Sequence, residues 1–373
     1  MRLPISAHVV GWLALTLALP GCSQNNAPVA GPKQTKPGTE SQNAGADGGS
    51  ATSDEPGDKA TPASSTPVGD PVSVAFVSNN PFEFWAIARR GTEKAAKEFN
   101  ADVEFHMPPN GTPSEQRQII EDLLVKGVKG IAISPNDAAN QASFLNEVAD
   151  KVPLITQDSD LPEGSKRLCY IGTNNYEAGK AAGKLVKQAL PDGGKVVIFV
   201  GKLDVQNAVE RRQGVLDELA GHEDAEGPDL GKYRLLDTMT DDASQEKCKA
   251  NVEDALVKNA ADVESLCLVG LWAYNPPAML AAAKGADLAG KVKLVGFDED
   301  EETLQGIQDG QIVGTVVQQP FEFGYQAVRL LAAITRGDRS VVPLGGIMFI
   351  DYRVITPDNV EAFAAELRKL KGS

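Results

Sequence analysis

The chain has 373 residues, of which 42% are hydrophobic and 23% charged, and its formal net charge is −15. The length allows two domains with cores of their own, and the composition is typical of a soluble globular protein. The negative charge argues against nucleic acid as a partner, because phosphates would be repelled. The three histidines, His8, His106 and His222, are scattered, so they supply neither a metal site nor a Ser-His-Asp triad.

The first segment predicts export. Arg2 precedes the apolar run 9–19, which has the length of a signal-peptide core and is too short for a transmembrane helix. Residues 19–22, Leu-Pro-Gly-Cys, resemble a bacterial lipobox, although Pro20 departs from the usual small or aliphatic residue. We predict a lipoprotein signal peptide over 1–22 with lipidation at Cys22. A secretory signal cut nearby is the alternative.

Residues 23–70 consist mainly of Pro, Gly, Ser, Thr, Ala and other polar residues. Such a stretch cannot bury enough apolar surface to offset its ordering entropy, so we predict a disordered tether. A tether after a lipidated cysteine would let a soluble body work away from the membrane. The remaining cysteines, Cys169, Cys248 and Cys267, have no metal-type or disulfide-framework spacing, and we expect buried thiols, with one oxidised pair left open.

From residue 71 onward, apolar β-branched runs alternate with segments of helical spacing. We expect strands at 72–77, 102–107, 130–134, 153–156, 196–200, 234–237, 265–269, 292–296 and 313–317, with helices such as 84–99, 114–125, 176–190 and 321–334 between them. This alternation predicts right-handed βαβ crossovers and parallel sheets. The strands are too many for one doubly wound sheet, so we predict two α/β lobes. A (β/α)8 barrel is the alternative, disfavoured by the strand count and uneven spacing.

Polar and aromatic residues follow nearly every predicted strand, where ligands of open parallel sheets bind. These segments are 79–85, 134–137, 157–160, 201–204, 240–242, 272–275, 297–298 and 318–319, with Arg211 and Arg212 in the helix after residue 204. Carboxylates, amides and guanidinium groups can pair with sugar hydroxyls, and flat aromatic rings suit the C–H faces of a sugar. The set therefore favours a polyhydroxylated ligand.

Each of these residues also has a structural interpretation. Asn, Asp and Ser after a strand are good helix N-caps, and the aromatics of 82–85 could begin a core face. The acidic run 298–302 fits the first turn of a helix better than a calcium loop, because the EF-hand glycine is missing. The chain has no phosphate-binding glycine motif after its first strand and no nucleophile–base pair. We therefore expect neither an enzyme nor a cofactor or metal.

Seven segments, in this order and spacing, resemble the ribose-type periplasmic binding proteins, the type I solute-binding proteins of sugar ABC transporters. They are VAFVSNNPFEFWAIARRG, GIAISPND, PLITQDSD, YIGTNNYEAGKAAG, NAVERRQGV, LVGFDED and VGTVVQQP. The resemblance implies two lobes, 71–173 with 319–347 and 174–318 with 348–373. It implies three crossovers, near Thr173–Asn174, Gln318–Gln319 and Gly346–Phe349.

The resemblance also implies which residues contact the sugar. Carried over by motif, they are Asn80, Phe82, Phe84 or Trp85, Asp158, Arg211, Asp298 and Gln318, with Trp272, Tyr274 and Asn275 competing for one further contact. Ribose binders have an arginine where this chain has Ser159, and here Glu83 lies among the aromatics. Both departures argue that the ligand is a pentose, hexose or polyol that need not be ribose.

The resemblance therefore implies an extracytoplasmic protein that captures a sugar or polyol by hinge closure and delivers it to an ABC transporter permease. We expect a monomer in the periplasm or cell envelope, attached to the membrane through its lipid anchor only. The alternative is a sugar sensor that docks on a chemoreceptor or sensor kinase. A sugar-responsive transcription regulator is disfavoured, because a signal peptide and tether stand where it would carry a helix-turn-helix.

Overall fold

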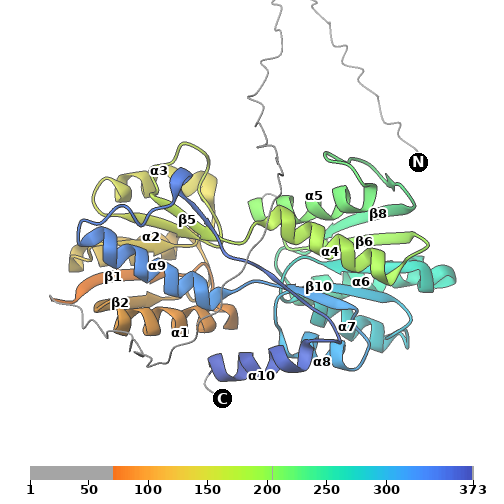
Figure 1. Ribbon diagram of the computed structural model, residues 1–373. Coiled ribbons are helices and arrows are strands. Elements are labelled where there is room, and N and C mark those ends of the chain that lie inside the picture. The colour runs from red at the N-terminus through yellow and green to blue at the C-terminus, as the bar shows by residue number, and fades with distance from the viewer. Residues whose placement is uncertain (1–69, 204, 372–373) are drawn as a thin grey trace, which may run out of the picture. The chain divides into compact units, whose positions relative to one another are not determined.

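The computed structural model describes residues 70–203 and 205–371. The predicted signal peptide, the lipidation site Cys22 and the predicted tether up to residue 69 lie outside the described residues. The described residues form two separate sheets with helices on their faces (Figure 1). This confirms the prediction of two α/β lobes and excludes the barrel.

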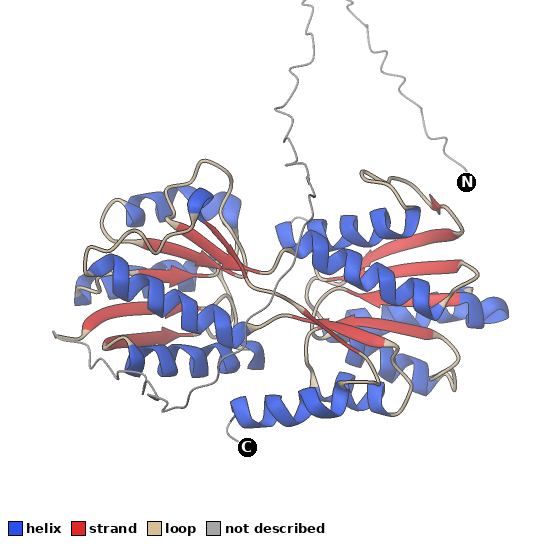
Figure 2. Ribbon diagram, viewed as in Figure 1, coloured by secondary structure: helices blue, strands red, loops and turns tan. Residues whose placement is uncertain are grey.

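The first sheet has six strands, all parallel, in the order β12-β5-β4-β3-β1-β2. They are β1 (Val72–Val77), β2 (Ala101–His106), β3 (Ile131–Ile133), β4 (Leu154–Gln157), β5 (Cys169–Gly172) and β12 (Ile347–Phe349). Apolar side chains alternate between two cores. One core packs against α1 (Glu83–Glu98) and α9 (Pro320–Thr335), the other against α2 (Pro113–Lys126) and α3 (Ala138–Ala149) (Figure 2).

The second sheet has seven strands in the order β13-β11-β10-β9-β6-β8-β7, and only the edge strands β13 and β7 are antiparallel to their neighbours. The strands are β6 (Gly194–Val200), β7 (Asp229–Leu230), β8 (Tyr233–Thr240), β9 (Leu266–Gly270), β10 (Lys293–Phe297), β11 (Gly314–Val317) and β13 (Arg353–Ile355). One core contains side chains of α4 (Asn175–Ala189) and α5 (Gln206–Ala220). The other contains those of α6 (Gln245–Lys258), α7 (Asn275–Gly285), α8 (Glu301–Gln308) and α10 (Val360–Lys371).

Five strands of each sheet follow the same order, β5-β4-β3-β1-β2 in the first and β11-β10-β9-β6-β8 in the second. In such a doubly wound sheet the strand order reverses beside the first strand, here between β1 and β3 and between β6 and β9. Ligands of these sheets bind beyond the carboxyl ends of the strands at that switch point. Each lobe therefore presents its own set of strand ends as half of a binding site.

The chain passes between the two lobes three times. The first passage, through residues 173–174, joins β5 to α4, and the second, through 318–319, joins β11 to α9. The third follows Phe349, because all of β12 pairs in parallel with β5. This corrects the third crossover predicted at Gly346–Phe349 and the lobe boundary placed after residue 347. Short strands such as β12 and β13 carry too few apolar positions to show in a pattern.

Local signals explain where several helices begin. Helix α2 starts with a capping box, in which the Thr112 hydroxyl accepts from the Glu115 N–H and the Glu115 carboxylate accepts from the Thr112 N–H, and Pro113 takes the first helical position. Asp300 caps α8 by accepting from the Glu302 N–H at 2.9 Å. The last three acids of the run 298–302 thus begin a helix, as predicted, whereas Asp298 and Glu299 precede it and lie just after the end of β10.

Two further sequence expectations concern cysteines and membranes. Cys169, Cys248 and Cys267 are buried free thiols, which confirms the prediction of small core residues. Across 70–203 and 205–371, no helix has both the length and the hydropathy that crossing a bilayer requires.

Candidate functional site

Two aspartates occupy matching positions at strand ends of the two lobes. Asp158 follows β4 and Asp298 follows β10, and both adopt the left-handed backbone conformation, with φ of 62° and 65°. Each donates its N–H to the neighbouring strand at 2.9 Å, Asp158 to Ile171 O and Asp298 to Val316 O. The same local fold therefore places one carboxylate from each lobe at the strand ends.

A hydroxyl group of the neighbouring strand donates a hydrogen bond to the backbone of each aspartate. The carbonyl oxygen of Asp158 accepts from the Tyr170 hydroxyl at 2.9 Å, and that of Asp298 accepts from the Thr315 hydroxyl at 2.9 Å. In each lobe the donor stands one residue before the strand residue that receives the aspartate N–H. A left-handed non-glycine residue is strained, so these backbone bonds offset the strain at both aspartates.

The two carboxylates are buried and interact with one arginine. Burial raises the pKa of Asp158 to about 6, while Arg211 and the Ser134 hydroxyl lower it. Burial also raises the pKa of Asp298, whereas Arg211 and hydrogen bonds from Gln318 lower it. Since Asp298 in turn raises the pKa of Asp158, the three charges lie close enough to interact. Carboxylates so placed accept hydrogen bonds strongly from any donor that reaches them.

Arg211 of α5, which acts on both carboxylates, is fixed by hydrogen bonds and an aromatic contact. Its Nε donates to Asn175 Oδ1 and its Nη1 to Leu271 O, both at 2.9 Å, and its guanidinium lies 4.6 Å from the Phe297 ring centroid. Its Nη2 is buried and has no hydrogen-bond partner among the described residues. The position depends on close packing of α4 on α5, where a Cβ on Gly179 would lie 2.2 Å from Arg211 O.

Asn79 contributes the amide of the first strand end. Its Nδ2 donates to the Ser134 hydroxyl at 3.1 Å and to Asp158 Oδ2 at 3.4 Å. Asn80, the predicted contact, uses its Oδ1 to accept from the Phe82 N–H and its Nδ2 to donate to Asn79. The structure thus gives Asn80 a turn-forming role and places Asn79 and Ser134 beside Asp158.

The aromatic residues of 82–85 separate into different environments. Trp85 is 1% exposed, packs on Phe76 and Phe84, and donates its ring N–H to Asn79 Oδ1 at 2.9 Å. Because the Trp85 ring is in the core, the structure favours Phe84 over Trp85 as the predicted ligand contact. Phe84 is half-buried against Phe323, whereas Phe82 is 53% exposed.

Trp272 is the aromatic candidate of the second lobe. Its ring lies on the backbone of Gly201, where an added Cβ would be 1.9 Å from the indole, and it meets Tyr274 edge to face at 6.2 Å. Its indole N–H is buried without a partner in the described part of the chain. Tyr274, the competing candidate, donates its hydroxyl to Asp241 Oδ1. These contacts favour Trp272 over Tyr274.

Asn275 and Gln318 differ in how much of each side chain is engaged. Asn275 is fully buried, accepts from the backbone N–H of Trp272 at 2.9 Å, and donates to Asp241 and to the Cys248 sulfur. The Asn275 amide is therefore engaged within the protein, which favours Trp272 over Asn275 as the predicted ligand contact of this segment. Gln318 donates to Asp298 Oδ1 at 3.1 Å, and its own Oε1 is buried without a partner among the residues described.

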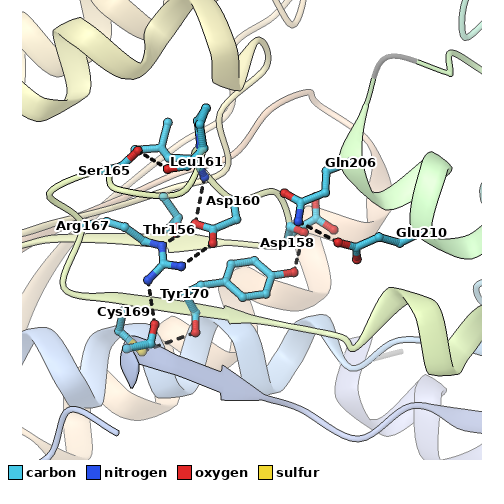
Figure 3. Close-up of polar contacts among 12 residues, drawn as sticks. Thr156, Asp158, Asp160, Leu161, Ser165, Arg167, Cys169, Tyr170, Gln206 and Glu210 are labelled. Atoms are coloured by element: carbon cyan, nitrogen blue, oxygen red, sulfur yellow. Dashed lines mark hydrogen bonds and ion pairs between the residues drawn. The ribbon is translucent and has the colours of Figure 1, made fainter. Parts of the chain in front are cut away.

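A cavity of about 280 Å³ opens on one side of Asp158. Of the predicted contacts it includes only Asp158, and its other walls come from β5, the first crossover, α5 and β12. Figure 3 shows Gln206 and Glu210 of α5 near Asp158 and Tyr170. No cluster of His, Cys, Asp or Glu suited to a metal ion occurs in residues 70–203 and 205–371.

The sequence prediction did not select Asn79, Ser134 or Asn175. Asn79 and Ser134 lie at or just after the ends of predicted strands, so position alone could have nominated them, whereas Asn175 follows the first predicted crossover. Their partners, however, lie up to 79 residues away in sequence, as for Asn79 and Asp158. Only the assembled sheet shows which of several strand-end residues face one another.

Comparison with known proteins finds one family model that matches most of the chain. The periplasmic binding protein domain matches residues 73–339, which include the strand ends that carry Asn79, Asp158 and Asp298. The chain belongs to the periplasmic binding protein family. This confirms the resemblance inferred from the seven sequence segments.

The names or titles of three similar proteins each mention a sugar. Ribose import binding protein RbsB of Salmonella typhimurium is 26% identical over 266 residues, 70% of this chain and 83% of that protein. The D-allose-binding periplasmic protein of Escherichia coli is 25% identical over 278 residues, 71% of this chain and 84% of that protein. An ABC transporter solute-binding protein from Burkholderia graminis, solved with D-arabinose, has a TM-score of 0.70 and 29% identity, covering 78% of this chain and 96% of its own.

Proposed function

We propose that this protein captures a sugar or polyol between its two lobes. The observation that carries the proposal is the pair of buried aspartates, one per lobe, that interact with a single rigid arginine. A carboxylate accepts from a hydroxyl, and a guanidinium donates to one, so this trio suits a ligand with hydroxyls around a ring. Relatives whose names specify ribose, allose or arabinose support the same class of ligand.

The remaining side chains fit the same role. Arg211 Nη2, Gln318 Oε1 and Trp272 Nε1 are buried polar atoms without a partner in the described chain, so they are free to bond a ligand. Trp272 from one lobe and Phe82 from the other supply flat surfaces for C–H faces. Binding would start on one lobe, and hinge motion at the three crossovers would complete the contacts and exclude water.

We further propose that the liganded protein delivers its sugar to an ABC transporter permease outside the cytoplasm. Names of the relatives that include import or ABC transporter support this step. Lipidation at Cys22 and the tether after it would keep a monomeric protein near its permease. Replacing Cys22 with Ala should move the protein from the membrane fraction to the soluble fraction and abolish labelling by a clickable fatty acid. Unchanged labelling would contradict lipidation at Cys22.

The binding class is tested by a thermal-shift screen of residues 23–373 against pentoses, hexoses, polyols, amino acids and nucleosides. A ligand at a hundredfold its Kd adds about 2.7 kcal/mol to the folded state. At roughly 2–4 °C per kcal/mol the midpoint should rise by several degrees with one or a few carbohydrates. A response to amino acids or nucleosides alone would overturn the proposal.

The role of Arg211 is tested by calorimetry on Arg211→Met, with Arg212→Met as the matched control. Arg212 is the adjacent arginine, but its Nε donates to the Thr238 hydroxyl at 3.0 Å, away from the aspartates. Losing a charged hydrogen bond costs about 1.5–3 kcal/mol, so Arg211→Met should weaken sugar binding by at least tenfold. Equal affinities for the two variants would contradict the assigned trio.

A further inference from the structure

The cavity beside Asp158 has features that a single bound sugar does not explain. Its volume of about 280 Å³ is close to the lower end of the roughly 300–1,000 Å³ found for ligand pockets. At about 30 Å³ per water it holds the equivalent of roughly nine waters. Asp158 lines this cavity and also belongs to the proposed sugar site, so the cavity and the sugar site share a wall.

Polar atoms of the cavity wall are buried and unused. Thr173, at the first crossover, is 1% exposed, and its hydroxyl has no hydrogen-bond partner in the part of the chain described. The side-chain oxygen of Asn207, on α5, is likewise buried and unpartnered. Buried polar groups in proteins are normally hydrogen-bonded, so two such unpartnered atoms on residues that line one cavity point to a ligand.

Of the acidic side chains in the cavity wall, Asp160 is paired with an arginine and Glu210 is not. Asp160 is neutralised by Arg167, whose Nε and Nη2 each lie 2.5 Å from one carboxylate oxygen (Figure 3). Glu210 accepts only from Gln206 Nε2, at 2.7 Å, and forms no ion pair among the described residues. With Asp158 also present, the cavity is net negative. An anionic group such as a phosphate or a uronate would therefore be repelled.

One wall of the cavity is apolar. Ile347 and Phe349 are alternate residues of β12 and therefore share a face of this edge strand. They are 42% and 55% exposed, and the ring of Tyr170 lies in the same cavity wall. Acceptors on one side and apolar surface on the other match the two faces of a sugar ring.

We propose that this cavity binds a second, neutral sugar unit attached to the one held by Asp158 and Asp298, so that the natural ligand is a disaccharide or glycoside. The inference rests on the proposed function, because the first unit occupies the site described above. Thr173 and Asn207 bond hydroxyls of the second unit, and Phe349 covers its C–H face. Ser159, whose side chain is small, lines the cavity next to Asp158.

The test measures binding of residues 23–373 by calorimetry to monosaccharides and to sucrose, maltose, lactose, cellobiose and trehalose, with glucose 6-phosphate as an anionic probe. We expect at least one neutral disaccharide to bind one per chain, to displace the monosaccharide, and to bind more tightly than it. The phosphorylated sugar should not bind.

The Thr173→Val variant then tests binding of the second sugar unit independently of the first. Valine keeps the shape and removes a hydroxyl that has no protein partner, so folding should be unaffected. Loss of one hydrogen bond should weaken the disaccharide roughly five- to tenfold and leave the monosaccharide within twofold. The matched control is Thr303→Val, because Thr303 on α8 is also fully buried with an unpartnered hydroxyl but does not line the cavity.

The outcomes separate this inference from the proposed function. Binding of monosaccharides but of no disaccharide overturns the inference and leaves the proposed function intact. Disaccharide binding that Thr173→Val and Phe349→Ala both leave unchanged also overturns it. Failure of every carbohydrate to bind overturns both.

Discussion

Replacing Asp158 with asparagine should stabilise the unliganded protein while weakening its binding of sugar. The substitution keeps the shape of the side chain and an oxygen that can accept from the Ser134 hydroxyl, now 3.1 Å from Asp158 Oδ2. It removes a buried negative charge that the ligand-free protein satisfies only in part. The variant therefore separates the stability of the fold from the function of the site.

The magnitude follows from the pKa of Asp158, which burial raises from its ordinary 3.8 to about 6. Since each pKa unit corresponds to 1.36 kcal/mol, the ionised carboxylate lowers the free energy of unfolding by about 3 kcal/mol. The folded protein binds its proton more tightly than the unfolded chain does. The cost is therefore fully present above pH 6, decreases as the pH falls, and is absent below about pH 4.

The assay is the melting temperature of wild type and Asp158→Asn without ligand, from pH 4 to pH 8. We expect the variant to melt roughly 5–10 °C higher at pH 7 to 8 and the difference to vanish near pH 4. Sugar affinity of the variant at pH 7 should be lower by at least tenfold, because a charged hydrogen bond of about 1.5–3 kcal/mol is lost.

Asp217→Asn is the matched control, because Asp217 is also a buried carboxylate, at 5% exposed. Burial pulls its pKa upward, but hydrogen bonds from the Ala225 N–H and the Tyr176 hydroxyl outweigh this and hold the pKa below its ordinary value. Its charge therefore stabilises the fold above pH 4, and the substitution should lower the melting temperature at pH 7. If Asp158→Asn lowered it as much, the reasoning about Asp158 would be refuted.

Three further predictions concern affinity, shape and thiol reactivity. Wild-type sugar affinity should fall about tenfold between pH 7 and pH 5, because protonating Asp158 near pH 6 removes a hydroxyl acceptor, and calorimetry on Asp158→Asn should show no such fall. Gly201→Ala should weaken sugar binding, since displacing Trp272 costs about 1–3 kcal/mol, whereas Gly285→Ala, where an added Cβ meets nothing within 4 Å, should bind normally in the same titration. Burial raises the pKa of Cys169 to about 11 and that of Cys248 to about 12, so mass spectrometry should find neither thiol alkylated by iodoacetamide at pH 8 until the protein is unfolded.

The sequence alone determined the fold class and where the site would lie. Strand and helix periodicity are local properties, and the carboxyl end of a parallel strand can be located from its own apolar run. That is why Asp158, Asp298 and Gln318 could be placed at strand ends, and Arg211 in the helix after one, before any contact was known; the family resemblance then nominated these four among their neighbours. Buried thiols and the helix start at 300–302 were equally local inferences.

Tertiary structure alone decided which strand-end side chains face the site. Asn79 and Asn80 are adjacent and chemically identical, yet only Asn79 reaches Ser134 and Asp158, because the order β4-β3-β1 places those strand ends side by side. Trp85 is in the core because its ring packs on Phe76, a residue of another element. The cavity beside Asp158 is also a product of assembly, since its walls come from four parts of the chain that no local pattern connects.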